Sequence, residues 1–227
     1  MGHFVELLTG TLALRFWVFG FFAWYLLGAV TKVGWLRAGL FTALAFTVAL
    51  VAELVSTRTG FPLGEYRFLE ATRGREVWLA HVPLWSPLLF CVLCWTGFQL
   101  AVLLYSPLEL RRGDLQALDT IAIRRSPRVL LTAAVLAATL GALLEPLKVR
   151  GESWLLGATH AWAEPGAFFG VPVATLAGWL VAALVTIAIY QRLEPRLLRP
   201  TPLLRAGQAH LPYAGLVEPA LALALSL

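Results

Sequence analysis

Two glutamates, Glu53 and Glu145, lie near the ends of long apolar segments. Glu53 follows fifteen uncharged residues (38–52), and Glu145 follows sixteen (129–144). A carboxylate in a segment that could span a membrane is costly, and it usually faces the interior of a helix bundle or a water-filled pocket. Burial there favours the protonated form, which a general acid requires. The alternative is that both lie at the water interface, where Glu145 would pair with Lys148 and Glu53 would cap local turn groups.

The segments that would position these acids are apolar and long enough to cross a membrane. The chain is 59% hydrophobic and 14% charged, whereas soluble domains carry about 25% charged residues. A spanning helix needs about 20 mostly apolar residues. Six segments fit, the last more weakly: 12–30, 38–55, 81–105, 129–147, 168–190 and 211–227. We therefore expect an all-α, polytopic transmembrane helix bundle of about six spans, with residues 1–227 forming a single integral membrane domain.

The charged residues indicate a topology. The net charge is +5, and the cations lie in short connections rather than on one helix face. We interpret these cations as signals for membrane topology and expect no nucleic-acid partner. Eleven Lys and Arg residues lie on the side of the first, third and fifth connections, and seven on the other side. The positive-inside rule then places the N-terminus outside a bacterial or archaeal cell membrane. Glu6 stands where a signal peptide would be basic, so we expect the first segment to be retained.

Two connections should meet at one membrane face, because alternate spans run in the same direction. These are 56–80 and 148–167, which lie on the same side as Glu53 and Glu145. In the connection 56–80, Gly60 and Gly64 flank a Pro and fix a tight path, with Gly60 or Gly64 at positive φ. Glu65 and Tyr66 follow immediately. The alternative is a re-entrant turn that only packs on the bundle.

The same face carries aromatic and histidine side chains. The connection 148–167 holds Trp154, His160 and Trp162, and His81 begins the third predicted segment. Aromatic residues at this level commonly form interface belts, so the two histidines are either interfacial or in direct contact with a substrate.

Two cysteines, Cys91 and Cys94, form a C-x-x-C within an apolar segment. A zinc site needs about four ligands, and the sequence has no second Cys pair, so we interpret both as small apolar residues on one helix face. Phosphate-binding Gly-rich loops, a G-x-S-x-G elbow and an H-E-x-x-H pair are also absent from the sequence. These absences argue against nucleotide-driven pumps and familiar hydrolases, and we expect no metal and no cofactor.

Several short motifs follow one another between about residues 50 and 180. They are Glu53, 59–66 (TGFPLGEY), 82–84 (VPL), 145–146 (EP), Trp162, 170–172 (GVP) and 178–179 (GW). In this order and spacing they resemble the membrane carotenoid-biosynthesis family, which includes the bisanhydrobacterioruberin hydratase and the gamma-carotene 1',2'-hydratase. The chain differs from the family pattern at 145–146, where an Asp-Pro-type element is common, and after 170–172, where an Asn is usual.

The resemblance implies a carotenoid 1,2-hydratase, which adds water across a terminal isoprenoid double bond of an acyclic or monocyclic carotenoid to give a tertiary alcohol. An unactivated alkene needs a strong proton donor, so Glu145 and Glu53 would form the acid/base pair. Protonation leaves a tertiary cation, which aromatic faces would stabilise. The candidates for substrate contact are Tyr66, Glu65, Trp162, Trp154, Trp85, His81 and His160. Hydration is redox-neutral and needs no cofactor.

The implied partners are a lipid-soluble carotenoid, the membrane lipid and other carotenoid enzymes. A second hypothesis is therefore a non-catalytic protein, either a membrane transporter or an assembly partner for those enzymes. Transporters commonly contain internal repeats with broken helices. The glutamates near the ends of the second and fourth predicted spans echo each other, but the sequence contains no convincing repeat.

Overall fold

The computed structural model describes residues 2–111, 114–149 and 159–197. The sixth predicted span, 211–227, and Trp154 lie outside the described residues. The helices are α1 (Gly2–Leu14), α2 (Phe16–Val33), α3 (Trp35–Thr59), α4 (Trp85–Tyr105), α5 (Ile121–Arg124), α6 (Pro127–Val149) and α7 (Val173–Leu197), with a 3-10 turn, η1, at Glu70–Thr72. By length and composition, five of them can cross a membrane: α2, α3, α4, α6 and α7. The chain is therefore an all-α membrane bundle, as predicted.

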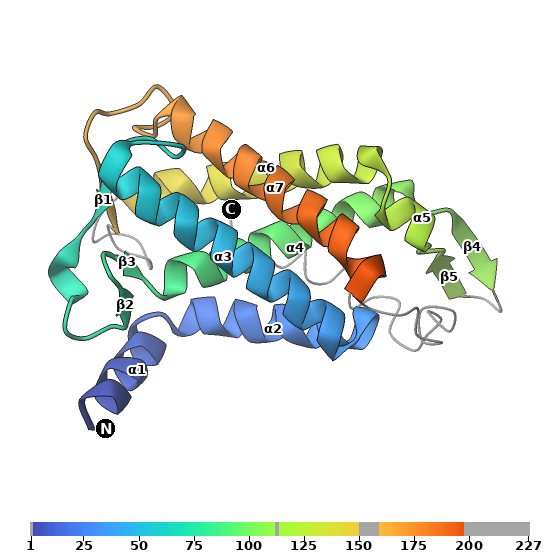
Figure 1. Cartoon of the computed structure of the whole chain (residues 1–227), viewed down its shortest axis with the longest axis horizontal. Coiled ribbons are helices and arrows are strands. Elements are labelled where there is room, and N and C mark those ends of the chain that lie inside the picture. Colours follow the sequence, from blue (N-terminus) through green and yellow to red (C-terminus); the bar gives the residue numbers. More distant parts are fainter. Residues whose placement is uncertain (1, 112–113, 150–158, 198–227) are drawn as a thin grey trace.

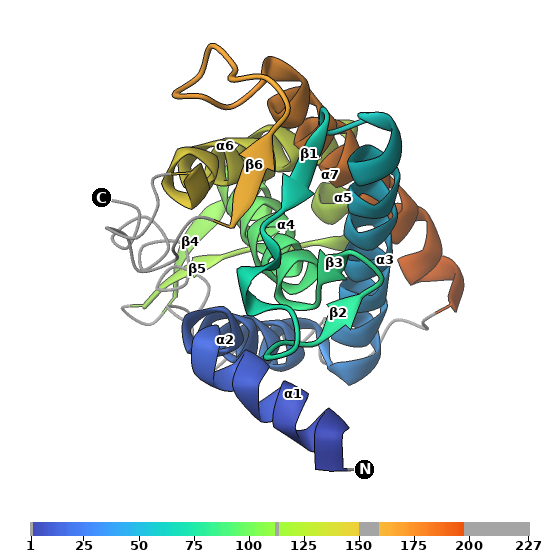
Figure 2. The ribbon, with the colours of Figure 1, turned by 90° about the vertical axis from the view of Figure 1, so that its left-hand side faces the viewer.

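Helix α4 lies at the centre of the bundle. Figure 1 shows the five long helices side by side along one axis, and the end view in Figure 2 shows α4 surrounded by α2, α3, α6 and α7. Small residues allow the backbones to approach, as is typical of membrane helices. A Cβ added at Gly97 of α4 would lie 2.7 Å from the carbonyl oxygen of Ala133 in α6. The side chains of α4 consequently form much of the core.

The first predicted span, 12–30, is wrong at its start. The chain breaks at Arg15 into the short helix α1 and the spanning helix α2. The guanidinium of Arg15 forms an ion pair with Glu76, with 2.9 Å between Nη2 and Oε1. This pair joins residues 61 positions apart, so the local apolar pattern gave no sign of the break.

Two further spans begin later than predicted. The third begins at Trp85 instead of 81, because strands β2 (Trp78–Leu79) and β3 (Val82–Pro83) form a hairpin there. The fifth begins at Val173 instead of 168, since Phe169 and Gly170 both have positive φ and form a turn. It also continues to Leu197, beyond the predicted end at 190.

The two connections that were expected to meet at one face do meet. Strand β1 (Tyr66–Phe68) pairs antiparallel with β6 (His160–Trp162), so that Tyr66 lies opposite Trp162 and Phe68 opposite His160. Figure 2 shows this ladder across the end of the bundle. Strands β4 (Leu108–Arg111) and β5 (Asp114–Ala117) form a separate hairpin at the opposite end.

A buried charge cluster lies at that opposite end, and it changes the interpretation of two cations. Arg37 and Arg124 were counted as connection residues, but both are buried. Arg37 Nε lies 3.0 Å from Glu194 Oε1, and Arg124 Nη1 lies 3.8 Å from the same oxygen. Burial lowers the pKa of Arg124, but the nearby acids, Asp119 and Glu194 among them, raise it by more, so the net pKa lies above its usual value. The two cations therefore join α3 and α5 to α7 through one buried acid.

Candidate functional site

The two acids singled out in the sequence are both buried inside the bundle. Glu53 lies in the last two turns of α3 and is 0% exposed, and Glu145 lies in the last two turns of α6 and is 2% exposed. Both helices end at the face that carries the β1–β6 ladder. Neither carboxylate is therefore exposed to water at the surface of the bundle.

Each carboxylate accepts a hydrogen bond from a side chain of another spanning helix. Ser86 Oγ, in the first turn of α4, donates to Glu53 Oε1 over 2.5 Å. Trp179 Nε1, in the second turn of α7, donates to Glu145 Oε1 over 3.2 Å. The Trp179 ring also stacks on Phe90, with 5.1 Å between ring centroids. Four helices thus hold the two acids in defined positions.

Tyr66 is the first residue of β1, in the connection between α3 and α4. Its side chain is buried. Burial raises the pKa of the Tyr66 hydroxyl well above its usual value, and negative charge on Glu53 or Glu145 raises it further. The hydroxyl therefore stays protonated at physiological pH, in the region at the end of the bundle where both acids lie. Among the described residues, the hydroxyl oxygen has no hydrogen-bond partner.

Aromatic rings form one wall of this region. The Tyr66 ring lies 5.0 Å from the Trp162 ring and 5.3 Å from His160, between centroids. His160 in turn lies 4.5 Å from Phe68 and 6.5 Å from Trp85. The register of the β1–β6 ladder brings these rings together, because residues directly opposite on neighbouring strands place their side chains close together. We call these five residues the aromatic wall.

The loop between α3 and β1 is fixed by contacts with two helices. Gly60 and Gly64 have φ of 76° and 87°, which confirms the prediction of positive φ. The backbone N–H of Leu63 donates to Ser56 Oγ of α3, and Thr175 Oγ1 of α7 donates to the Leu63 carbonyl oxygen over 2.6 Å. Gly178 allows α7 to approach, since a Cβ there would lie 2.5 Å from the Pro62 carbonyl oxygen. The loop is therefore held against α3 and α7, and it leads directly to Tyr66 at the start of β1.

The other sequence candidates differ in the position and exposure of their side chains. Trp85, Trp162 and His160 belong to the aromatic wall. The Glu65 side chain is exposed, and only its carbonyl oxygen is used, as the acceptor from Ala163 N–H. His81 is half-buried in the β2–β3 turn. The Glu65 side chain therefore does not join the two buried acids.

Sequence reasoning missed Ser86 and Trp179 as partners of the acids. A single Ser at the start of an apolar span carries no signal of a carboxylate partner on another helix. Trp179 did carry one, because it belongs to the Gly-Trp motif at 178–179. Its role follows from packing of α7 on α6, which the motif alone does not give.

Metal-binding residues do not gather in the part of the chain that the structure describes. No group of three or more His, Cys, Asp and Glu side chains there could hold a metal ion. Cys91 and Cys94 are free and buried in α4, and the Cys91 thiol donates to the Pro87 carbonyl oxygen over 3.2 Å. The two thiols thus lie in the helix core as small apolar residues, as interpreted from the sequence.

Comparison with known proteins gives one match. A family model described as "carotenoid biosynthesis protein" matches residues 2–226. No curated protein and no solved structure matches the chain.

Proposed function

Because this chain belongs to the carotenoid biosynthesis protein family, whose model matches nearly its whole length, we propose that it is a carotenoid 1,2-hydratase. It would add water across a terminal isoprenoid double bond of an acyclic or monocyclic carotenoid and give a tertiary alcohol. The observation that carries the proposal is the pair of buried carboxylates, Glu53 and Glu145, at the end of the bundle that also carries Tyr66. Ionisable side chains inside a membrane bundle are costly and usually functional.

The first step needs a proton donor in a dry environment. Glu145 would transfer its proton to the less substituted carbon of the terminal double bond. This leaves a carboxylate on Glu145 and a tertiary cation on the neighbouring carbon. The faces of Tyr66 and Trp162 lie in the wall of the site, and aromatic faces attract cations. A buried carboxylic acid suits this step, because general acid catalysis depends on a donor held within reach of the reacting atom.

The second step needs a base. A water molecule would form the carbon–oxygen bond with the cation, and the proton that it loses would go to Glu53. Glu53 suits this role because its hydrogen bond from Ser86, at 2.5 Å, has the length expected when a hydroxyl donates to a carboxylate. One hydrogen and one hydroxyl are thereby added, and no electron is transferred.

The third step restores the two acids. After the reaction Glu53 carries a proton and Glu145 lacks one. Transfer of the proton from Glu53 back to Glu145 would restore the starting state. The reaction then needs no cofactor, and the chain would act on the carotenoid within the membrane lipid.

Replacement of Glu145 tests the proposal. The wild-type protein and Glu145→Gln are expressed in cells that make an acyclic carotenoid, and the pigment mass is measured. We expect the wild type to add the mass of one water. Gln keeps the shape of Glu but is not an acid, so hydration should fall by roughly 10²–10⁴-fold, the usual contribution of general acid–base catalysis. Glu164→Gln is the matched control, because Glu164 is exposed at the same face.

Two outcomes would contradict the proposal. A loss of less than tenfold in Glu145→Gln, with normal membrane insertion, would remove Glu145 from the reaction. Unchanged pigment with the wild-type protein, in cells that make a suitable precursor, would favour the second hypothesis of a non-catalytic transporter or an assembly partner for carotenoid enzymes.

A further inference from the structure

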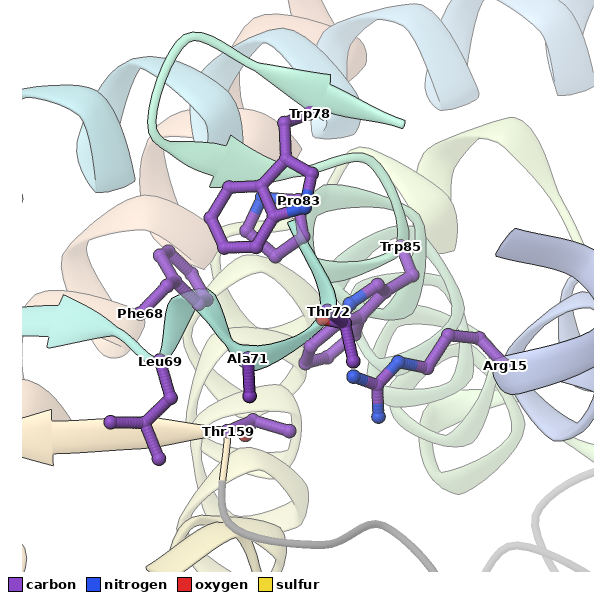
Figure 3. A pocket seen from close by; sticks show the side chains of 9 residues that line it. All are labelled: Arg15, Phe68, Leu69, Ala71, Thr72, Trp78, Pro83, Trp85 and Thr159. Atoms are coloured by element: carbon purple, nitrogen blue, oxygen red, sulfur yellow. The ribbon is translucent and has the colours of Figure 1, made fainter. Parts of the chain in front are cut away.

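A small cavity adjoins the aromatic wall, because Phe68 and Trp85 belong to both. Figure 3 shows its lining, which comes from the α1–α2 junction, the β1–η1 segment, the β2–β3 hairpin and the residue before β6. The space open to the centres of water molecules is about 30 Å³. A cavity needs only about 10–15 Å³ of such space to hold one water molecule. The cavity therefore has room for about two.

The lining of the cavity contains polar groups that water can bond. Figure 3 shows the Arg15 guanidinium beside the Trp85 ring, with Thr72 next to both and Thr159 below. The guanidinium carbon lies 4.9 Å from the Trp85 ring centroid. Among the described residues, the buried ring nitrogens of Trp78 and Trp85 have no hydrogen-bond acceptor. Buried polar groups are normally satisfied by protein groups or ordered water, and water in the cavity would place an acceptor next to both rings.

A buried hydrogen bond connects the cavity with the aromatic wall. Thr159 lines the cavity, and its Oγ1 lies 2.7 Å from His160 Nδ1. The His160 ring also lies 5.3 Å from the Tyr66 ring, between centroids. His160 thus contacts both a residue of the cavity lining and Tyr66. Thr159 and His160 form the polar route from the cavity towards the candidate site.

We propose that this cavity holds the water that hydration consumes, and that Thr159 and His160 control its passage to the acids. The proposal rests on the proposed function, since it names the source of the second reactant. Glu53 and Glu145 are buried, so water needs a defined path to reach them. The water that passes His160 would give its oxygen to the tertiary cation and one proton to Glu53. Thr159 and His160 are positioning residues, because they act on the water and not on the carotenoid.

The first test does not depend on activity. Hydroxyl-radical footprinting of the purified wild-type protein by X-ray radiolysis modifies side chains that contact bound or bulk water. Trp85 and Trp95 are a matched pair, because they are 2% and 1% exposed but only Trp85 lines the cavity. Phe61, 73% exposed, is the positive control. We expect clear modification of Trp85 and Phe61 and almost none of Trp95. Equal protection of Trp85 and Trp95 would mean a dry cavity and would overturn the proposal.

The second test measures hydration in variants of the lining. Thr159→Val removes the hydroxyl that bonds His160, and Ala71→Leu places a larger side chain at the cavity. Loss of one hydrogen bond to the water should lower the hydration rate roughly 2- to 12-fold in Thr159→Val, and Ala71→Leu should also lower it. Ala167→Leu is the control for Ala71→Leu, because Ala167 is exposed in another loop at the same face.

The outcomes separate this proposal from the proposed function. Wild-type rates in both lining variants, together with loss of hydration in Glu145→Gln, would overturn the water path and leave the hydratase in place. A wild type that hydrates no carotenoid would refute the hydratase, and the footprinting of Trp85 would then decide alone whether the cavity holds water.

Discussion

Ser86 is the residue whose role is easiest to separate from folding. Its hydroxyl donates to Glu53 Oε1 over 2.5 Å, and both side chains are buried. A hydrogen bond to a charged group is worth about 1.5–3 kcal/mol. We therefore expect Ser86→Ala to lower the hydration rate roughly 10- to 100-fold, because Glu53 loses the group that holds it in position as a base. The rate is measured in membranes with equal amounts of protein.

A matched control for this substitution lies at the other end of the same helix. Ser106, the residue that follows α4, is also buried, and its hydroxyl donates to the Val102 carbonyl oxygen. Ser106→Ala should leave the rate near that of the wild type. Equal losses in the two variants would indicate a general packing defect and would contradict the assigned role of Ser86.

The composition of the site could be predicted from single residues only in part. Glu53 and Glu145 were recognisable because a charge after a long apolar run is costly, whatever the fold. Their hydrogen-bond donors were not recognisable, since Ser86 and Trp179 reach them only through the packing of α4 on α3 and of α7 on α6. Glu65, next to Tyr66 in the sequence, points the other way because successive residues of an extended chain face opposite sides.

The loop between α3 and β1 depends on close approach to α7. A Cβ on Gly178 would lie 2.5 Å from the Pro62 carbonyl oxygen and 2.8 Å from Leu63 Cδ2. Overpacking of this kind costs about 1–3 kcal/mol, so Gly178→Ala should lower the melting temperature, followed by tryptophan fluorescence in detergent. It should also lower hydration, because the loop positions Tyr66.

Gly141→Ala is the matched control at this scale. Gly141 is also inside a spanning helix, and nothing lies within 4 Å of its added Cβ. Ala favours a helix over Gly by up to about 1 kcal/mol, so the melting temperature should stay the same or rise. A Gly178→Ala protein as stable and as active as Gly141→Ala would mean that α7 does not fix the loop.

The helices themselves were predictable because five of them exceed the length and apolarity needed to cross a membrane. The ends of the helices were not predictable, because they depend on contacts that only the structure shows. The break at Arg15 depends on Glu76, far along the chain. The late start of α4 depends on the pairing of Leu79 with Val82, residues that are apolar enough to continue a helix. Apolar runs predict that a span is present, whereas contacts outside the run decide where the helix begins.

At the scale of the whole molecule, the buried charges far from the site contribute stability rather than chemistry. Glu194 of α7 pairs with Arg37 of α3 and lies 3.8 Å from Arg124. Removal of one partner from a buried pair costs about 3–5 kcal/mol, because the remaining charge is left uncompensated. Glu194→Gln should therefore strongly lower the melting temperature.

The control is an ion pair of the same type at the surface. Glu70 pairs with Arg73, and both side chains are more than half exposed. Glu70→Gln should change stability by no more than about 1 kcal/mol. Similar melting temperatures for the Glu194→Gln and Glu70→Gln proteins would show that the buried cluster does not hold the helices together.

For the proposed hydration, the position of Glu53 and Glu145 at one end of the bundle would limit how often each substrate molecule can react. An acyclic carotenoid has two equivalent ends, but Glu53 and Glu145 both lie near the same end of the bundle. A stiff polyene hydrated at one end would have to dissociate and turn around before the other end could enter. Hydration would then be distributive. In a time course, the singly hydrated carotenoid should accumulate before the doubly hydrated one appears, and excess substrate should prolong that delay.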